Sequence, residues 1–125
     1  MSKMFRRLQK PYRVRNKYGN KTSRYKGRSY HSRREADDAM WLDSLLQQGL
    51  IKQVVPQYKM SIDVNGVHIC NHFVDFMVIL NDGRVKYVET KGIWTDIYRF
   101  KLKLIKALCP TIEYLINPKE KELLY

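Results

Sequence analysis

The chain has 125 residues, of which 44% are hydrophobic, and a formal net charge of +12. This length suits one domain with a single core, and no apolar run approaches the roughly 20 residues needed to span a membrane. No apolar stretch follows the basic N-terminus, so no signal peptide is expected, and Cys70 and Cys109 indicate reduced thiols of an intracellular protein.

The positive charge is concentrated at the N-terminus. Residues 1–30 hold eleven Lys or Arg and no Asp or Glu, whereas the remaining residues hold thirteen and twelve. Glycine, proline and the lack of periodicity predict an irregular segment over residues 1–28. We interpret it as a flexible nucleic-acid-binding arm ahead of a domain over residues 29–125, the alternative being a solvated tail. The expected contacts in the arm are Arg13, Arg15, Lys17, Tyr18, Lys21, Arg24, Lys26 and Arg28.

A first helix is predicted from Ser32 to Gln48, with Gly49 as its stop. Ser32 is a good N-cap, and Glu35 at the third helical position completes a capping box. Glu35 also lies near the middle of the apolar arc, where a carboxylate that faces the core needs a polar partner. Glu35 is therefore either a site residue or only a capping residue. The apolar arc consists of Ala39, Leu42, Leu45 and Leu46.

Strands follow this helix. Residues 51–55 predict a short strand interrupted by Pro56, and residues 58–64 alternate as a half-buried strand. Asn65-Gly66 is a type I′ turn signal, after which residues 67–80 return as a strand. Asp75 lies inside the apolar part of that strand, where an unpaired carboxylate is costly, so we expect a partner or a metal beside it.

Residues 73–92 predict a hairpin whose turn is Asn81-Asp82-Gly83. With a three-residue loop and Gly83 in a bulge, Asp75 lies opposite Glu89, and Lys91 points to the same side as Glu89. Facing carboxylates repel each other unless something binds them, and a divalent cation with oxygen ligands is the natural neutraliser. The alternative is a salt-bridged trio on a sheet surface, which is worth only about 0–1 kcal/mol.

A second helix is predicted from Thr95 to Leu108, followed by a strand over residues 111–116 that is parallel to its neighbour and a loose end over residues 117–125. Lys101 falls among the apolar positions, so it either extends its stem to the rim or reaches toward the carboxylates. Helix, strands, hairpin, helix and strand predict an α/β fold with one mixed sheet flanked by helices. The expected apolar arc of the second helix is Ile97, Phe100, Leu104, Ile105 and Leu108, and its basic face is Arg99, Lys103 and Lys106.

The spacing of Asp75, then thirteen residues, then Glu89-Thr90-Lys91 resembles the D-(x)n-E-x-K motif of the PD-(D/E)XK nuclease superfamily. Asn16-Lys17-Tyr18-Gly19 and the helix that begins at Ser32 resemble small phage-encoded, Holliday-junction-resolvase-like members. The resemblance covers roughly residues 16–116 and implies a single restriction-endonuclease-like domain with an αβββαβ core. Thr90 departs mildly from the aliphatic residue that is common between Glu and Lys.

The resemblance implies an Mg²⁺- or Mn²⁺-dependent endonuclease that hydrolyses DNA phosphodiester bonds, leaves a 5′-phosphate and acts on branched DNA in phage recombination. It implies Asp75, Glu89, the carbonyl of Thr90 and Glu35 as metal ligands, and Lys91 as the charge that stabilises the transition state. Lys101 is the additional catalytic candidate. Symmetric cutting of a junction needs two active sites and hence a homodimer. The expected location is the cytoplasm of a bacterial host, with no membrane partner.

Other functions stay open at this point. Within the same chemistry, the protein could nick or degrade ordinary duplex or single strands. A non-catalytic nucleic-acid-binding protein that keeps the fold and the arm is the alternative from a different class. A zinc site on His68, Cys70 and His72 is a minor alternative, because no distal Cys/His pair completes it. Further DNA contacts are expected from Arg33, Arg34, Arg99 and Lys103.

Overall fold

The computed structural model describes residues 23–30 and 32–125, and the chain forms two compact units, Met1–Ala36 and Asp37–Tyr125. In the first unit, β1 (Ser23–Tyr25) and β2 (Arg28–Tyr30) pair antiparallel. Our expectation of irregular chain up to residue 28 is wrong for this part, because a tight turn with Gly27 at φ +77° allows local pairing without any periodicity. The rest of the expected arm, residues 1–22, lies outside the described residues.

Helix α2 (Arg33–Gln47) agrees with the predicted first helix. The backbone N–H of Glu35 donates to the Ser32 hydroxyl at 3.1 Å, which is the predicted N-cap. Gly49, at φ +73°, ends the helix, and the N–H of Leu50 bonds back to the carbonyl of Leu45. The expectation that Leu46 belongs to the buried apolar arc is wrong. Leu46 is 37% exposed in the last turn, where the apolar face leaves the core.

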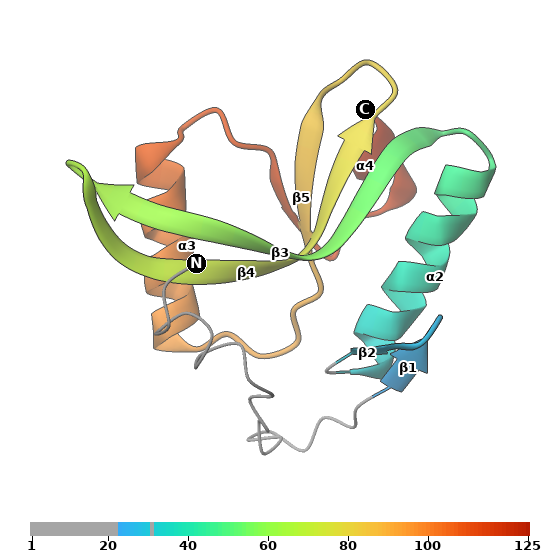
Figure 1. Cartoon of the computed structure of the whole chain (residues 1–125), viewed down its shortest axis with the longest axis horizontal. Helices are drawn as coiled ribbons and strands as arrows, with labels where there is room; N and C mark the ends of the chain where they lie inside the picture. The colour runs from blue at the N-terminus through green and yellow to red at the C-terminus, as the bar shows by residue number, and fades with distance from the viewer. Residues whose placement is uncertain (1–22, 31) are drawn as a thin grey trace. The chain divides into compact units, whose positions relative to one another are not determined.

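Four strands form one mixed sheet, as predicted, in the order β3-β4-β5-β6. Figure 1 labels the first three of these strands. They are β3 (Ile51–Val64), β4 (Val67–Leu80), β5 (Val85–Glu89) and β6 (Tyr114–Ile116). The first three pair antiparallel, and β6 lies parallel to β5 after the crossover through α3. From α2 to β6 the order of elements is therefore αβββαβ.

Strand β3 is one continuous strand, whereas two strands separated by Pro56 were expected. Pro56 pairs with Phe76 and is tolerated because β3 is an edge strand, whose outer side needs no donor. Gln57 takes φ +51° beside it, so the chain absorbs the irregularity locally. The predicted Asn65-Gly66 turn is present, with φ of +51° and +79°.

Helix α3 (Asp96–Leu108) begins where predicted, with the Tyr98 N–H donating to the Thr95 hydroxyl at 3.1 Å. Its orientation differs from the prediction. Ile97 and Phe100 are 70% and 65% exposed, and of the five residues expected in the apolar arc only Ile105 is buried. The buried face also includes Tyr98 and Leu102, which pack against Val74 and Tyr114. The apolar positions of this helix span a wider arc than the sheet can cover.

The C-terminal residues form a short helix, α4 (Glu120–Leu124), where a loose end was expected. Leu123 is fully buried, and the ammonium of Lys86 in β5 donates to the carbonyl of Glu122 at 2.8 Å. Lys86 is only 2% exposed and also pairs with Glu113 at 3.3 Å, so this buried cation fastens the chain end to the sheet. Among the described helices, none is long and apolar enough to cross a membrane.

Candidate active site

The β4–β5 hairpin brings Asp75 and Glu89 to facing positions. The pairing of Phe76 with Val88 is the last of the ladder, and one further step in the same register sets Asp75 against Glu89. The turn between the strands has three residues, closed by a backbone hydrogen bond of 2.8 Å between the flanking residues, and Gly83 takes φ +91°. This is the loop geometry on which the sequence-based register depended.

Glu89 is buried, and Asp75 opposite it is half-buried. Glu89 is 4% exposed, and the N–H of Thr90 donates to Asp75 Oδ2 at 2.7 Å. Burial, then the charge of Glu89 and a hydrogen bond to it, raise the pKa of Asp75 to about 8. Burial also raises the pKa of Glu89, while the hydrogen bond from Asp75 lowers it. The pair therefore retains a proton to a higher pH than an ordinary carboxyl group does, and a divalent cation would displace it.

A hydrogen-bond network that the sequence did not reveal holds one oxygen of Glu89. The hydroxyl of Tyr114 donates to Glu89 Oε1 at 2.6 Å, and His72 Nε2 lies 2.9 Å from that hydroxyl and 3.3 Å from the same Oε1. Burial, then the charges of Lys101 and Lys91, lower the pKa of His72 to about 4. His72 is therefore neutral at physiological pH, and its Nε2 carries the proton because the only proton of the Tyr114 hydroxyl goes to Glu89.

Lys91 directs its ammonium to an aromatic ring. Its Nζ lies 3.9 Å from the centroid of the Tyr98 ring. Within the described residues, Lys91 forms no ion pair with Asp75 or Glu89, but its charge lowers the pKa of both carboxyl groups. Asn117 fixes the backbone on both sides, accepting from the Lys91 N–H at 2.9 Å and donating to the Lys91 carbonyl at 2.8 Å. Lys91 is thus held beside the carboxyl pair without being neutralised by it.

Asp38 is a second residue that the sequence did not reveal. It lies in α2, one turn after Glu35, and its Oδ2 accepts a hydrogen bond of 2.5 Å from the Thr90 hydroxyl. The backbone of the same Thr90 donates to Asp75. Thr90 therefore links α2 to the carboxyl pair through both its hydroxyl and its backbone N–H.

The other predicted site residues are more dispersed. Glu35 is 4% exposed and belongs to the first unit, so its predicted role as a metal ligand stays a prediction. The ammonium of Lys101 donates to the carbonyl of Asn71 at 3.2 Å, next to His72, instead of to a carboxylate. Lys26 lies at the β1–β2 turn, 5.7 Å from the Tyr25 ring centroid.

The predicted DNA contacts fall into three groups. Exposed on the helices are Arg33, Arg34, Arg99 and Lys103. Arg24, Lys26 and Arg28 lie in β1, the turn after it and β2. Outside the described residues are Arg13, Arg15, Lys17, Tyr18 and Lys21.

The donor set suits a hard cation only in part. Asp75 and Glu89 supply carboxylate oxygens, the ligands that Mg²⁺ and Mn²⁺ prefer. Over residues 23–30 and 32–125, no group of three or more His, Cys, Asp and Glu side chains could hold a metal ion. A complete ligand set therefore needs further oxygens from the Thr90 carbonyl, water, the DNA phosphate or Glu35. The roles of the Thr90 carbonyl and of Glu35 as ligands stay predictions.

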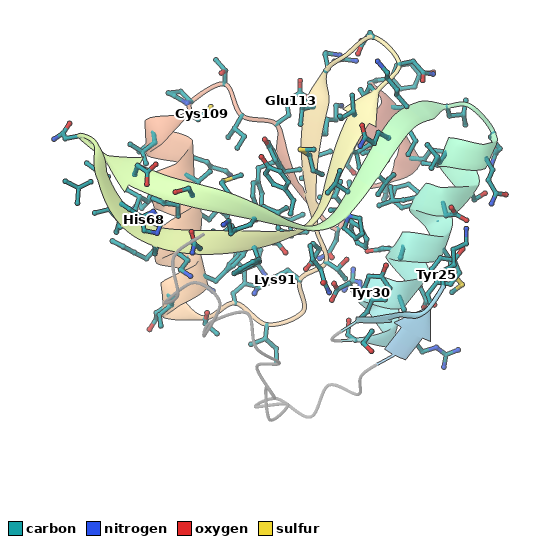
Figure 2. The ribbon with its side chains drawn as sticks, viewed as in Figure 1. Tyr25, Tyr30, His68, Lys91, Cys109 and Glu113 are labelled. Carbon is teal, nitrogen blue, oxygen red and sulfur yellow. The ribbon has the colours of Figure 1, made fainter. Side chains whose placement is uncertain are left out.

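Another cluster has the composition of a hydrolase triad but not its geometry. Ser61 Oγ and Asp63 Oδ1 both lie 2.9 Å from the same nitrogen, Nδ1 of His68. In a triad the serine and the carboxylate use opposite nitrogens of the imidazole. His68 lies out along the β3–β4 hairpin, well away from Lys91 (Figure 2). With His72 buried against Tyr114, these histidines do not form the zinc site considered above.

Comparisons with known proteins add no name to this site. Neither a scan against protein-family models nor a search of curated proteins finds a match for this chain.

Proposed function

We propose that this protein is a restriction-endonuclease-like, metal-dependent DNA endonuclease of the PD-(D/E)XK type, acting on branched DNA. The observation that carries the proposal is the pair of half-buried Asp75 and buried Glu89 on facing strands, with Lys91 two residues beyond Glu89. Facing carboxyl groups cost a fold stability even when a proton offsets their repulsion, and an apolar pair of similar size would be at least as stable, so a purely structural role is a poor explanation for this pair.

Each residue of the site has a part in phosphodiester hydrolysis. Asp75 and Glu89 would hold an Mg²⁺ or Mn²⁺ ion, which supplies charge neutralisation and an activated water. Tyr114 and His72 hold Oε1 of Glu89, which leaves Oε2 as the oxygen available to a metal. The Lys91 ammonium lies on the Tyr98 ring, from where it can stabilise the negative charge that develops on the phosphate.

The basic surface is consistent with a polyanionic partner. The chain carries a net charge of +12, and Arg99, Lys103 and Lys106 are exposed on α3, the helix that follows the site. Phosphate contacts of this kind give affinity without sequence preference. A homodimer and an intracellular location, in the bacterial host of a phage, belong to the same proposal.

Binding and cleavage need separate assays to test this proposal. Gel shifts in Ca²⁺ measure binding without turnover, and end-labelled four-way junction, flap and linear duplex in Mg²⁺ measure cutting. We expect binding in Ca²⁺ and preferential, paired cuts in the junction. Equal cutting of all three substrates would favour a general nuclease. Tight binding with no cutting in Mg²⁺ or Mn²⁺ would favour the non-catalytic nucleic-acid-binding protein.

A further inference from the structure

A row of ring and cation contacts runs from the candidate site to the surface of α3. The Lys91 ammonium lies on the Tyr98 ring, and the Tyr98 ring meets the Trp94 ring edge-on, with centroids 5.3 Å apart and planes at 80°. The guanidinium carbon of Arg99 lies 5.8 Å from the Trp94 centroid. Trp94 is thus two contacts away from the catalytic lysine.

The two aromatic residues of this row differ in exposure. Tyr98 is 6% exposed and belongs to the core cluster with Val74 and Tyr114, whereas Trp94 is 40% exposed. Ile93, which precedes it, is 43% exposed. The Tyr98 contact supports the indole from the core side, and the remaining indole surface is open beside an exposed arginine. An exposed tryptophan with a cation on it is a surface for a ligand that is both aromatic and anionic.

We propose that Trp94 and Arg99 bind an unpaired nucleotide beside the scissile phosphate, the indole stacking on the base and the guanidinium contacting a phosphate. In a continuous duplex each base face is covered by its neighbours, so this surface selects DNA that exposes bases at a flap, gap or branch point. This inference rests on the proposed nuclease function, because it takes the carboxyl pair as the site of cleavage, and it names the substrate class of that site.

A second copy of this chain is the competing occupant. Ile97 and Phe100, on the first two turns of α3, are also exposed and apolar, as a protein interface would be. The arginine on Trp94 favours the nucleotide, because a guanidinium in an apolar protein interface would need an acidic partner. The test below therefore includes a measurement of whether the protein self-associates through this surface.

Tryptophan fluorescence can report this contact directly. The full-length Trp41→Phe variant leaves Trp94 as the source of indole emission. It is titrated in Ca²⁺ with a blunt duplex and with the same duplex carrying a gap of unpaired thymines. We expect strong quenching by the gapped DNA and little by the duplex at equal saturation. Absent quenching, or equal quenching by both, would overturn the proposal.

Matched variants give the second arm of the test. Trp94→Ala should weaken binding of gapped DNA by about 10-fold or more and leave duplex binding nearly unchanged, and Trp94→Phe should restore most of the affinity. The control is Phe100→Ala, which removes a nearby exposed ring, 65% exposed in α3, that carries no arginine. Equal losses for Trp94→Ala and Phe100→Ala would contradict a specific stacking contact.

Two outcomes separate this inference from the proposed function. If the parent cuts gapped DNA and Trp94→Ala binds it as tightly as the parent does, this inference fails and the nuclease proposal stands. If the parent neither binds nor cuts any of the DNAs, both fail. A lower sedimentation mass for Trp94→Ala without DNA, with DNA binding unchanged, would assign the surface to a second copy of the chain.

Discussion

The ammonium of Lys91 lies 3.9 Å from the centroid of the Tyr98 ring, beside a carboxyl pair that it does not contact directly. Tyr98 is buried and held in turn by the rings of Trp94 and His72, at centroid distances of 5.3 and 5.9 Å. The lysine is therefore anchored on a rigid surface from α3. An ion pair with Asp75 or Glu89 would tie up the oxygens that a cation needs.

Removing the ring should uncouple Lys91 from the reaction. Tyr98→Leu is expected to slow cleavage by about 10-fold or more, whereas Tyr98→Phe, which keeps the ring, should cut nearly as fast as the parent. In a Lys91→Met background, Tyr98→Leu should have little further effect on the single-turnover rate. Additive losses in the double variant would show that Tyr98 acts only through the core.

Because of the carboxyl pair, we expect an unusual pH dependence of the unfolding free energy of the metal-free protein. The pKa of Asp75 is about 8 in the folded protein and 3.8 as its ordinary value, so the folded state retains a proton that the unfolded state has lost. The free energy of unfolding should therefore fall as the pH rises from about 6.5 to about 8. Below pH 6.5 the lowered pKa of His72 opposes this fall, because only the unfolded state binds a proton on His72 there. Urea unfolding in EDTA at several pH values checks this. Asp75→Asn should flatten the slope, and a parent whose stability rises across this window would contradict the assignment.

The hydrogen bond between Thr90 and Asp38 should support the site. Thr90→Val keeps the shape of the side chain but leaves Asp38 without its donor, so we expect a loss of about 1 kcal/mol in unfolding free energy. Cleavage should slow as well. The backbone N–H of Thr90 orients Asp75, and without the bond between the Thr90 hydroxyl and Asp38 this stretch of backbone is held less firmly. Thr90→Ser keeps the hydroxyl and is the control. Equal cleavage by Thr90→Val and the parent would show that this link is dispensable.

Lys86 should contribute to stability and not to cleavage. Its ammonium bonds the Glu122 carbonyl, and its stem is buried. Lys86→Ala should lower the unfolding free energy by about 1–3 kcal/mol, with part of the loss recovered in Lys86→Met, which refills the space of the stem. The specific activity of the folded fraction should stay unchanged. A fall in activity without a fall in stability would mean that α4 takes part in the reaction.

Local turn chemistry made the centre of the site predictable. Asn81-Asp82-Gly83 fixes a three-residue loop, and the loop fixes the register that brings Asp75 opposite Glu89. The N-terminal ends of both helices, at Ser32 and Thr95, were predictable for the same reason, because capping depends on residues within one turn.

The other contacts of the site depend on packing between residues that are distant in the sequence, and they could not be predicted. The contact of Tyr114 with Glu89 depends on the register of a parallel strand reached through a whole helix, and no local pattern encodes that register. The buried face of α3 was predicted wrongly for a similar reason. Periodicity groups Ile97 with Ile105, but the helix buries Tyr98 and Leu102 with Ile105, and no local pattern shows which part of its wide apolar arc meets the sheet.

The central claim is that the Asp75–Glu89 pair catalyses metal-dependent cleavage, and single-turnover cutting of a labelled four-way junction in Mg²⁺ tests it most directly. The variants are Asp75→Asn and, as a control from the exposed turn of the same hairpin, Asp82→Asn. We predict that the parent and Asp82→Asn cut alike, while Asp75→Asn, folded and DNA-bound, is slower by roughly 100-fold or more. Cutting by Asp75→Asn at the parent rate would contradict the claim.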